Sequence, residues 1–263
     1  MLALAKTWWK ILIIALAGAG AAFGLHQIIP VSASMAGPFS PLVEAIGFPA
    51  VVCGYFVVAF SLMLVTFVLI QEHLTGTRLS KGLRCGFAMT IIWYVGLLET
   101  NSLVGTPLVD EAVMAIADII PVFLMSLLLA YFSTTDTPVA PARKAGWRAI
   151  PVIALCYFVG RILAYTLIHI ESGYIARSLA TLIWTASMGL AVGISYWLLV
   201  FGLTDPARKT RLLWFGGLFF GLNWLVFNLF APLVLGASFI DIIIRVGIDV
   251  LCIMLGVFIA EKL

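Results

Sequence analysis

Eight long apolar stretches, separated by short connections, constrain this chain more than any other feature. A helix needs about 20 apolar residues to cross the hydrocarbon core of a bilayer. Hydrophobic residues make up 63% of the 263 and charged residues 10%, against about 45 to 50% and about 25% in soluble domains. The sequence therefore predicts an all-α, polytopic integral membrane protein whose eight transmembrane helices lie in the lipid bilayer. The expected spans are residues 11–29, 46–70, 85–104, 109–132, 149–170, 179–203, 212–235 and 238–260.

Basic residues occupy alternate connections, which predicts how the chain is oriented. Short loops rich in Lys and Arg stay in the cytoplasm. The connections on the other side contain only Arg177. We therefore expect both termini in the cytoplasm and the chain in the plasma (inner) membrane of a prokaryotic cell. The net charge of +3 is explained by these basic connections, so we expect no nucleic-acid partner. The basic residues are Lys6, Lys10, Arg78, Lys81, Arg84, Arg143, Lys144, Arg148, Arg208, Lys209, Arg211 and Lys262.

A shift of 131 residues aligns the second half of the chain with the first. Apolar identities are common in so biased a composition, whereas Trp, Gly and two acids in ungapped register are rarer. Each unit would contain four helices, an even number, so both units run in the same direction as parallel repeats. We expect a first four-helix repeat over residues 1–135 and a second over 136–263. The pairs that coincide are Trp93 with Trp224, Gly105 with Gly236, Asp110 with Asp241, and Asp118 with Asp249.

Three charged residues are expected near the middle of the membrane. A charge at the centre of a membrane helix costs roughly 2.5 to 3.5 kcal/mol on insertion scales, so such residues are candidate functional residues. At about 1.5 Å of rise per residue, Asp118, Asp249 and Arg161 lie roughly 13 to 16 Å from the outer ends of their helices. Two acids and one cation are therefore predicted at a common depth.

Arg245 makes the two units unequal. It lies four residues after Asp241 and four before Asp249, so it can pair with either acid on one helical face. The aligned residue of the first unit is Met114. The second unit thus carries its own counter-ion, and we expect Asp118 to pair instead with Arg161.

Two further polar residues complete the candidate substrate or ion site. Glu99 lies near the outer end of the third predicted helix, and Asn223 lies near mid-depth in the seventh. An acid in that position needs a cationic partner, and a buried amide can line a cavity or bond between helices.

Asp110 and Asp241 are expected to play a different part. Each follows a turn and begins a helix, after Gly105 and Gly236 respectively. Acids in the first turn favour the helix dipole and can cap free backbone amides. We therefore expect these two residues to be helix-start caps.

These residues support three functional hypotheses. The first is a membrane protein that translocates a small solute or ion through a central polar site between the two units. The second is a non-catalytic membrane subunit or scaffold that binds other membrane proteins, its acids fully paired. The third and least favoured is a membrane enzyme that uses Asp118 and Asp249 as a carboxylate dyad, which requires the two carboxyls to approach closely.

No cofactor is expected. The four cysteines form no CxxC pair, and thiolate metal sites need clustered ligands. His26 and His169 are expected near the outer ends of the first and fifth helices, where an interfacial histidine is a simpler interpretation than a haem ligand. The chain also lacks the sequence motifs of zinc proteases, serine hydrolases and P-loop enzymes.

Three GxxxG pairs predict close helix packing. They are Gly20 with Gly24, Gly189 with Gly193, and Gly217 with Gly221. Small residues at this spacing let two helix backbones approach. Packing within one molecule is expected rather than dimerisation.

Overall fold

The structure is a computed structural model that describes residues 2–29, 38–138, 146–200 and 211–262. Eight of its helices are long and apolar enough to cross a membrane, which confirms the predicted number. These candidate spans are Thr7–Ile28, Phe48–Ile70, Arg78–Val104, Leu108–Ser133, Gly146–Ile168, Ser178–Val200, Leu213–Val234 and Phe239–Ala260. No strand lies within the described ranges.

The first four spans are mostly regular α-helices. They are α1 (Leu2–Ile28), α3 (Phe48–Ile70), α4 (Arg78–Leu97) with its continuation α5 (Glu99–Val104), and α6 (Leu108–Ser133). Two short elements accompany them, α2 (Pro41–Ile46) and the 3-10 turn η1 (Gln71–His73).

The last four spans are less regular. They are η2 (Gly146–Arg148) leading into α7 (Ala149–Leu163) and the π-helical η3 (Ala164–Ile168); α8 (Ser178–Val200); the π-helical η4 (Leu213–Leu222) leading into α10 (Asn223–Asn228) and α11 (Phe230–Val234); and α12 (Phe239–Ala260). π-helical segments are rare in proteins. Where they do occur, they often lie at functional sites. Here they occur in the two spans that supply α7 and α10.

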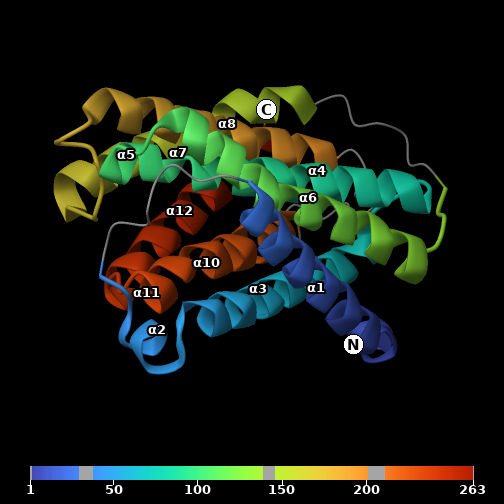
Figure 1. The fold of residues 1–263 in the computed structure, drawn as a ribbon. Coiled ribbons are helices and arrows are strands. Elements are labelled where there is room, and N and C mark those ends of the chain that lie inside the picture. The colour runs from blue at the N-terminus through green and yellow to red at the C-terminus, as the bar shows by residue number, and fades with distance from the viewer. Residues whose placement is uncertain (1, 30–37, 139–145, 201–210, 263) are drawn as a thin grey trace.

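The helices pack in the same order in both halves. In the first half α1 contacts α3 and α6, and α6 contacts α4; in the second, α7 contacts α8 and α12, and α12 contacts η4 and α10. The halves meet where α4 packs on α8 and where α3 packs on η4, α10 and α11. Figure 1 shows the long helices side by side, with the short helices α2, α5 and α11 gathered at one end.

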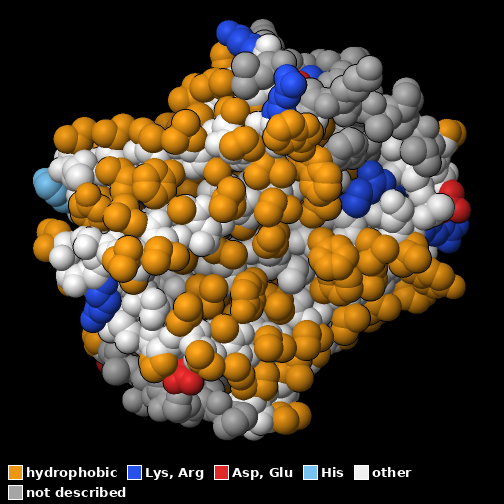
Figure 2. All heavy atoms as spheres, turned by 90° about the horizontal axis from the view of Figure 1, so that it is seen from above, with side chains coloured by type: hydrophobic (Ala, Val, Ile, Leu, Met, Phe, Trp, Pro, Cys, Tyr) orange, Lys and Arg blue, Asp and Glu red, His pale blue; other side chains and the backbone are white. Residues whose placement is uncertain are grey.

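Basic residues cluster at the end of the bundle opposite those short helices. Lys10 donates to the carbonyl of Phe132 at 2.7 Å, and Arg211 pairs with Glu261 beside the start of η4. Arg143, Lys144, Arg208 and Lys209 lie outside the described residues. We call this the basic end and the other the α5 end. Figure 2 shows apolar side chains across most of one face, with Lys and Arg toward its margins.

The third span of each half is interrupted at aligned leucines. The break between α4 and α5 lies at Leu98, and the break between α10 and α11 lies at Leu229. Near the first break, hydroxyls compete for backbone carbonyls: Thr100 donates to Leu97 at 2.9 Å. Near the second, Pro232 has no N–H to give the carbonyl of Asn228. Different residues thus produce breaks at matching positions.

The three GxxxG pairs have different surroundings. A Cβ added at Gly189 would lie 2.8 Å from the carbonyl oxygen of Ala154, and one at Gly193 would lie 2.7 Å from that of Ile150. These two glycines therefore let α8 approach the backbone of α7, as predicted.

A Cβ at Gly20, Gly24 or Gly217 would meet no described atom within 4 Å. One at Gly221 would lie 3.1 Å from the side chain of Val250 rather than against the backbone of a neighbouring helix. Among the described residues, the predicted close approach of two backbones is therefore found for one pair only.

Gly193→Ala should destabilise the protein, because the methyl group would press on the backbone of α7 rather than on a side chain that can move. Overpacking of this kind costs about 1 to 3 kcal/mol. The thermal unfolding of the purified protein in detergent measures the effect. Gly20→Ala is the matched control and should leave the midpoint unchanged or raise it, since alanine is the better helix former. Equal midpoints for the two variants would contradict this account of the α7–α8 contact.

Candidate functional site

The centre of the site is a buried ion pair between Asp249 on α12 and Arg161 on α7. The guanidinium binds both carboxylate oxygens, through Nε to Oδ1 at 2.7 Å and Nη2 to Oδ2 at 2.6 Å. Trp224 of α10 donates its indole N–H to Oδ2 at 2.7 Å. Arg161 is 0% exposed and Asp249 is 1% exposed. Forked pairing of this kind is both strong and directional, so it fixes three spans of the second half against one another.

Aromatic rings enclose the guanidinium of Arg161. Its central carbon lies 5.6 Å from the ring centre of Tyr157, 5.9 Å from that of Tyr165 and 5.1 Å from that of Trp184. The negative ring faces attract the cation in the absence of water. The cation is thus held by rings as well as by Asp249.

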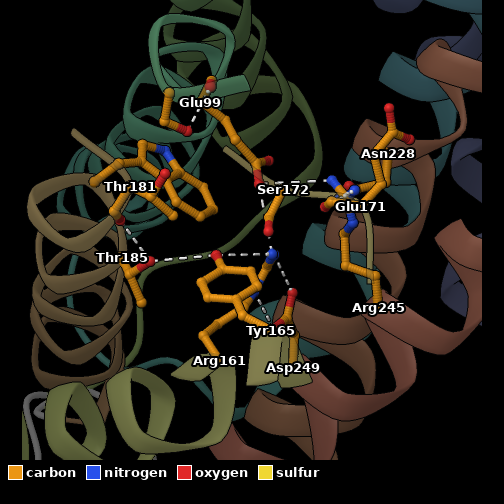
Figure 3. Close-up of polar contacts among 12 residues, drawn as sticks. Glu99, Arg161, Tyr165, Glu171, Ser172, Thr181, Thr185, Asn228, Arg245 and Asp249 are labelled. Carbon is orange, nitrogen blue, oxygen red and sulfur yellow. Dashed lines mark hydrogen bonds and ion pairs between the residues drawn. The ribbon is translucent and has the colours of Figure 1, made fainter. Parts of the chain in front are cut away.

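Glu99 extends the cluster toward the α5 end. Its Oε1 lies 3.4 Å from Nη1 of Arg161 and 3.5 Å from Nη1 of Arg245. Glu99 is the first residue of α5, directly after the break at Leu98. It therefore belongs to the first half of the chain and joins that half to the charges of the second (Figure 3).

Arg245 links the cluster to the connection that follows η3. Its Nη2 contacts Oδ2 of Asp241 at 3.2 Å and donates to the carbonyl of Glu171 at 2.6 Å. Asp241 in turn accepts the backbone N–H of Glu171 at 3.1 Å. A chain of contacts thus runs from Asp249 through Arg161 and Glu99 to Arg245 (Figure 3) and continues to Asp241.

The buried part of this chain is electrically balanced. Asp249 and Glu99 supply two negative charges, and Arg161 and Arg245 supply two positive ones. Removing ions from water costs several kcal/mol each unless partners and hydrogen bonds compensate. Charge balance explains how four ionisable groups can be buried together.

Asp118 does not join this cluster and instead contacts His26. Its Oδ1 lies 3.0 Å from Nε2 of His26 on α1. The histidine ring stacks on Phe56 of α3, with ring centres 6.3 Å apart. The side chain of His26 is 24% exposed and that of Asp118 is 9% exposed, so this pair is more accessible than the pair of Arg161 and Asp249.

The expected pairing of Asp118 with Arg161 is therefore wrong. The two residues face different neighbours, because α6 packs on α1 whereas α7 packs on α12. His26 was the partner that sequence reasoning missed. The sequence held one signal for it, since His26 lies in the first span of the first half and Arg161 in the first span of the second.

The aligned tryptophans also differ in what they bind. Trp224 donates to Asp249, whereas the indole nitrogen of Trp93 is buried and has no hydrogen-bond partner among the described residues. Trp93 packs edge-on against Phe227, with ring centres 5.2 Å apart. The aligned positions therefore share a residue type but not a bond.

Asn223 is not brought into the cluster. It donates to the carbonyl of Phe219 within its own span, and its Oδ1 is buried without a partner in the part of the chain that the structure describes. The amide therefore satisfies its own helix, where the π-helical η4 ends, rather than lining the charged site.

The expected capping role of Asp241 needs correction. Both Asp110 and Asp241 lie in the first turn of their helices, where an acid favours the helix dipole, but Ser238 is the residue whose side chain caps α12. Ser238 binds the N–H of Asp241 at 3.3 Å, which leaves that carboxylate free to bind Arg245 and Glu171.

Two surface hollows lie outside the cluster. One, of ≈ 520 Å³, is lined by Asn101, Gly105 and residues 176–180. The other, of ≈ 510 Å³, is an apolar groove over η4, α10 and α12. Neither is lined by Asp249, Arg161, Glu99 or Asp118. Within the described residues no group of three or more His, Cys, Asp or Glu is placed to hold a metal ion.

Comparison of the chain with family models, with curated proteins and with solved structures finds no match. The functional argument therefore rests on the chemistry of the residues described above.

Asp249→Asn should destabilise the protein strongly, because it leaves the guanidinium of Arg161 buried without its negative partner. Breaking a buried pair from one side costs about 3 to 5 kcal/mol. Thermal unfolding in detergent measures the loss. Glu44→Gln, on the exposed face of α2, is the control and should change the stability by about 0.5 kcal/mol or less. A small effect of Asp249→Asn would show that the pair contributes little to the fold.

Proposed function

We propose that this chain is a membrane protein that translocates a small solute or ion. The observation that carries the proposal is the chain of contacts from Asp241, in the first turn of α12, to Asp249 near the middle of that helix. Their separation of eight positions corresponds to about 12 Å along the helix. Charged residues at such depth are rare in membrane helices and commonly mark substrate or ion pathways.

The backbone around this path supports the proposal. Interrupted helices near the mid-membrane often form transporter sites, because they place polar backbone beside the substrate. Glu99 stands directly after the interruption at Leu98. Arg161 lies just before the π-helical η3, and Trp224 lies just after the π-helical η4. Irregular backbone thus accompanies three of the residues in the cluster.

Beyond Asp249, toward the basic end, aromatic packing replaces charge. Trp224 stacks on Phe220, which lies one turn nearer the basic end, with ring centres 5.9 Å apart, and Phe219 stacks on Phe215 at 5.6 Å still nearer that end. In the proposed mechanism the path is thus open to polar contacts from the α5 end and closed toward the basic end. Transport would require these aromatic residues to separate in an alternate arrangement of the two halves.

We further propose that the two halves are parallel repeats of one four-helix unit. The packing order, the aligned breaks at Leu98 and Leu229, and the left-handed Gly105 and Gly236 that end the two third spans all support this. Equivalent hydrogen bonds also cross between the halves. Tyr55 on α3 donates to the carbonyl of Val226 at 3.1 Å, and Trp184 on α8 donates to that of Val95 at 2.7 Å.

The basic end is proposed to face the cytoplasm of a prokaryotic cell. Lys and Arg are retained on the cytoplasmic side of short loops, and this end holds Lys10, Arg84 and Arg211. The path from Asp241 to Asp249 would then open to the outside of the plasma membrane.

A scaffold that binds other membrane proteins is the second candidate. The observation that favours it is that each of the four buried charges of the cluster lies beside an opposite charge, which a structural role requires and a transport site does not. Co-purification with a stoichiometric partner, together with no flux after reconstitution, would select this alternative. The carboxylate dyad is less supported, because Asp118 and Asp249 each bind a separate base.

Reconstitution into liposomes tests translocation. Fluxes of protons, alkali cations and small anions should be screened, and at least one should exceed the flux of empty vesicles. Glu99→Gln should reduce that flux at least about tenfold, because it removes the charge that joins the two arginines. Glu44→Gln, on the exposed face of α2, is the control and should transport normally. Normal flux in Glu99→Gln would exclude the proposed path.

The reciprocal hydrogen bonds predict similar costs in the two halves. Tyr55→Phe should leave carbonyls of α10 without their donor, and Trp184→Phe should do the same for the carbonyl of Val95. Each should lower the free energy of unfolding by about 1 to 3 kcal/mol. Trp147→Phe, at an exposed position, should have little effect. Unequal costs would argue against equivalent roles, once the additional contact of Trp184 with Arg161 is allowed for.

A further inference from the structure

Within the charged cluster, Glu99 is bound far more loosely than Asp249. Its two contacts, at 3.4 and 3.5 Å, both use Oε1. The contacts of Asp249 with Arg161, at 2.6 and 2.7 Å, use both oxygens. Charge-assisted N–H···O bonds are typically about 2.7 to 2.9 Å long. Glu99 therefore neutralises two guanidiniums without binding either of them well.

One of those guanidiniums has a donor to spare. The Nε of Arg245 is buried and has no hydrogen-bond partner among the described residues. Arg245 is 4% exposed, and leaving a buried donor unbound costs free energy. An anion with two well-placed oxygens could therefore bind these arginines better than Glu99 does.

The two arginines stay in place without help from Glu99. Arg161 is fixed by Asp249 and by three aromatic rings, and Arg245 is fixed by Asp241 and the carbonyl of Glu171. Glu99 comes from the other half of the chain, on a six-residue helix that starts after a break. At 7% it is the most exposed of the four buried charges. The site is thus preorganised, and its carboxylate is the element that can leave.

We propose that Arg161 and Arg245 form a binding site for a small carboxylate, which Glu99 fills as an internal ligand. A free carboxylate the size of formate or acetate takes its place when Glu99 withdraws. Two guanidiniums that contact the same carboxylate oxygen repel cations and favour planar anions with two oxygens. The positions of Glu99, Arg161 and Arg245 are sufficient to support the binding site. Its role as the substrate site rests on the proposed translocation.

Glu99→Ala tests the site directly, because it removes a carboxymethyl group and leaves room for acetate between the two arginines. Thermal unfolding of this variant in detergent should be measured in sodium formate, sodium acetate and sodium chloride at equal ionic strength. We expect a saturable rise in the midpoint with formate and acetate, of about 3 to 6 °C at a tenfold excess over the Kd. Chloride should give no such rise.

Two matched variants separate binding from general salt effects. Glu99→Gln keeps the volume of the side chain and should show no carboxylate-specific rise, because the space remains filled. Glu99→Ala combined with Arg245→Met should also show none, since methionine is the residue at the aligned position Met114. If acetate stabilises all three variants and the wild type equally, the proposal is overturned.

The instability of Glu99→Ala provides a second measurement. Should the variant aggregate when membranes are solubilised in chloride, solubilisation in acetate should recover a monodisperse peak on size-exclusion chromatography. Failure of acetate to recover it, or an unchanged midpoint in a variant that does purify, would overturn the site.

Uptake of radiolabelled acetate by wild-type proteoliposomes then tests the link to transport. Carboxylate binding by Glu99→Ala without any flux in the wild type would keep the site and remove the proposed function. Flux of another ion, with no carboxylate binding in Glu99→Ala, would keep translocation and remove the site. Saturable acetate flux in the wild type, absent from Arg245→Met, is the expected result.

Discussion

The pairing of Arg161 with Asp249 is the interaction on which the arrangement of the second half depends. Neither ion could remain in an apolar bundle alone, since the uncompensated burial of one charge costs several kcal/mol. Their forked contact sets the separation and rotation of α7 and α12, and the bond from Trp224 adds α10. The rings of Tyr157, Tyr165 and Trp184 then pack against the cation. The cluster that includes Glu99 and Arg245 is built outward from this pair.

Much of the fold could be predicted because membrane helices are specified by composition and length. The eight candidate spans followed from the apolar stretches and their lengths. Partners could not be predicted in the same way. Depth gives the level of a residue but not the direction in which its side chain points, so Arg161 was assigned to the wrong acid. The role of Glu99 required knowing that α5 begins beside α7 and α12.

The two halves of the chain carry different chemistry on the same packing order of helices. The acid of the fourth helix and the base of the first are paired in both, as Asp118 with His26 and as Asp249 with Arg161. Histidine has an ordinary pKa within the physiological range, whereas arginine is always charged. Arg245 in place of Met114 and the two π-helical segments occur in the second half. The second half thus holds the fixed charges of Arg161, Arg245 and Asp249. The first half supplies Glu99, the carboxylate that withdraws in the proposed binding site.

The broken third spans bear on how such a molecule could have arisen. The last four carbonyls of a helix have no donor within that helix, and in lipid no water is available to replace it. Here Val226 is bound by Tyr55 of the other half, and Val95 by Trp184 of the other half. A single four-helix unit would leave the carbonyl beside the break in its third span without a donor. The Tyr or Trp of its second span would likewise have no carbonyl to bind. On the proposed duplication, the ancestral unit was already a two-fold symmetric homodimer before its two copies were joined into one chain.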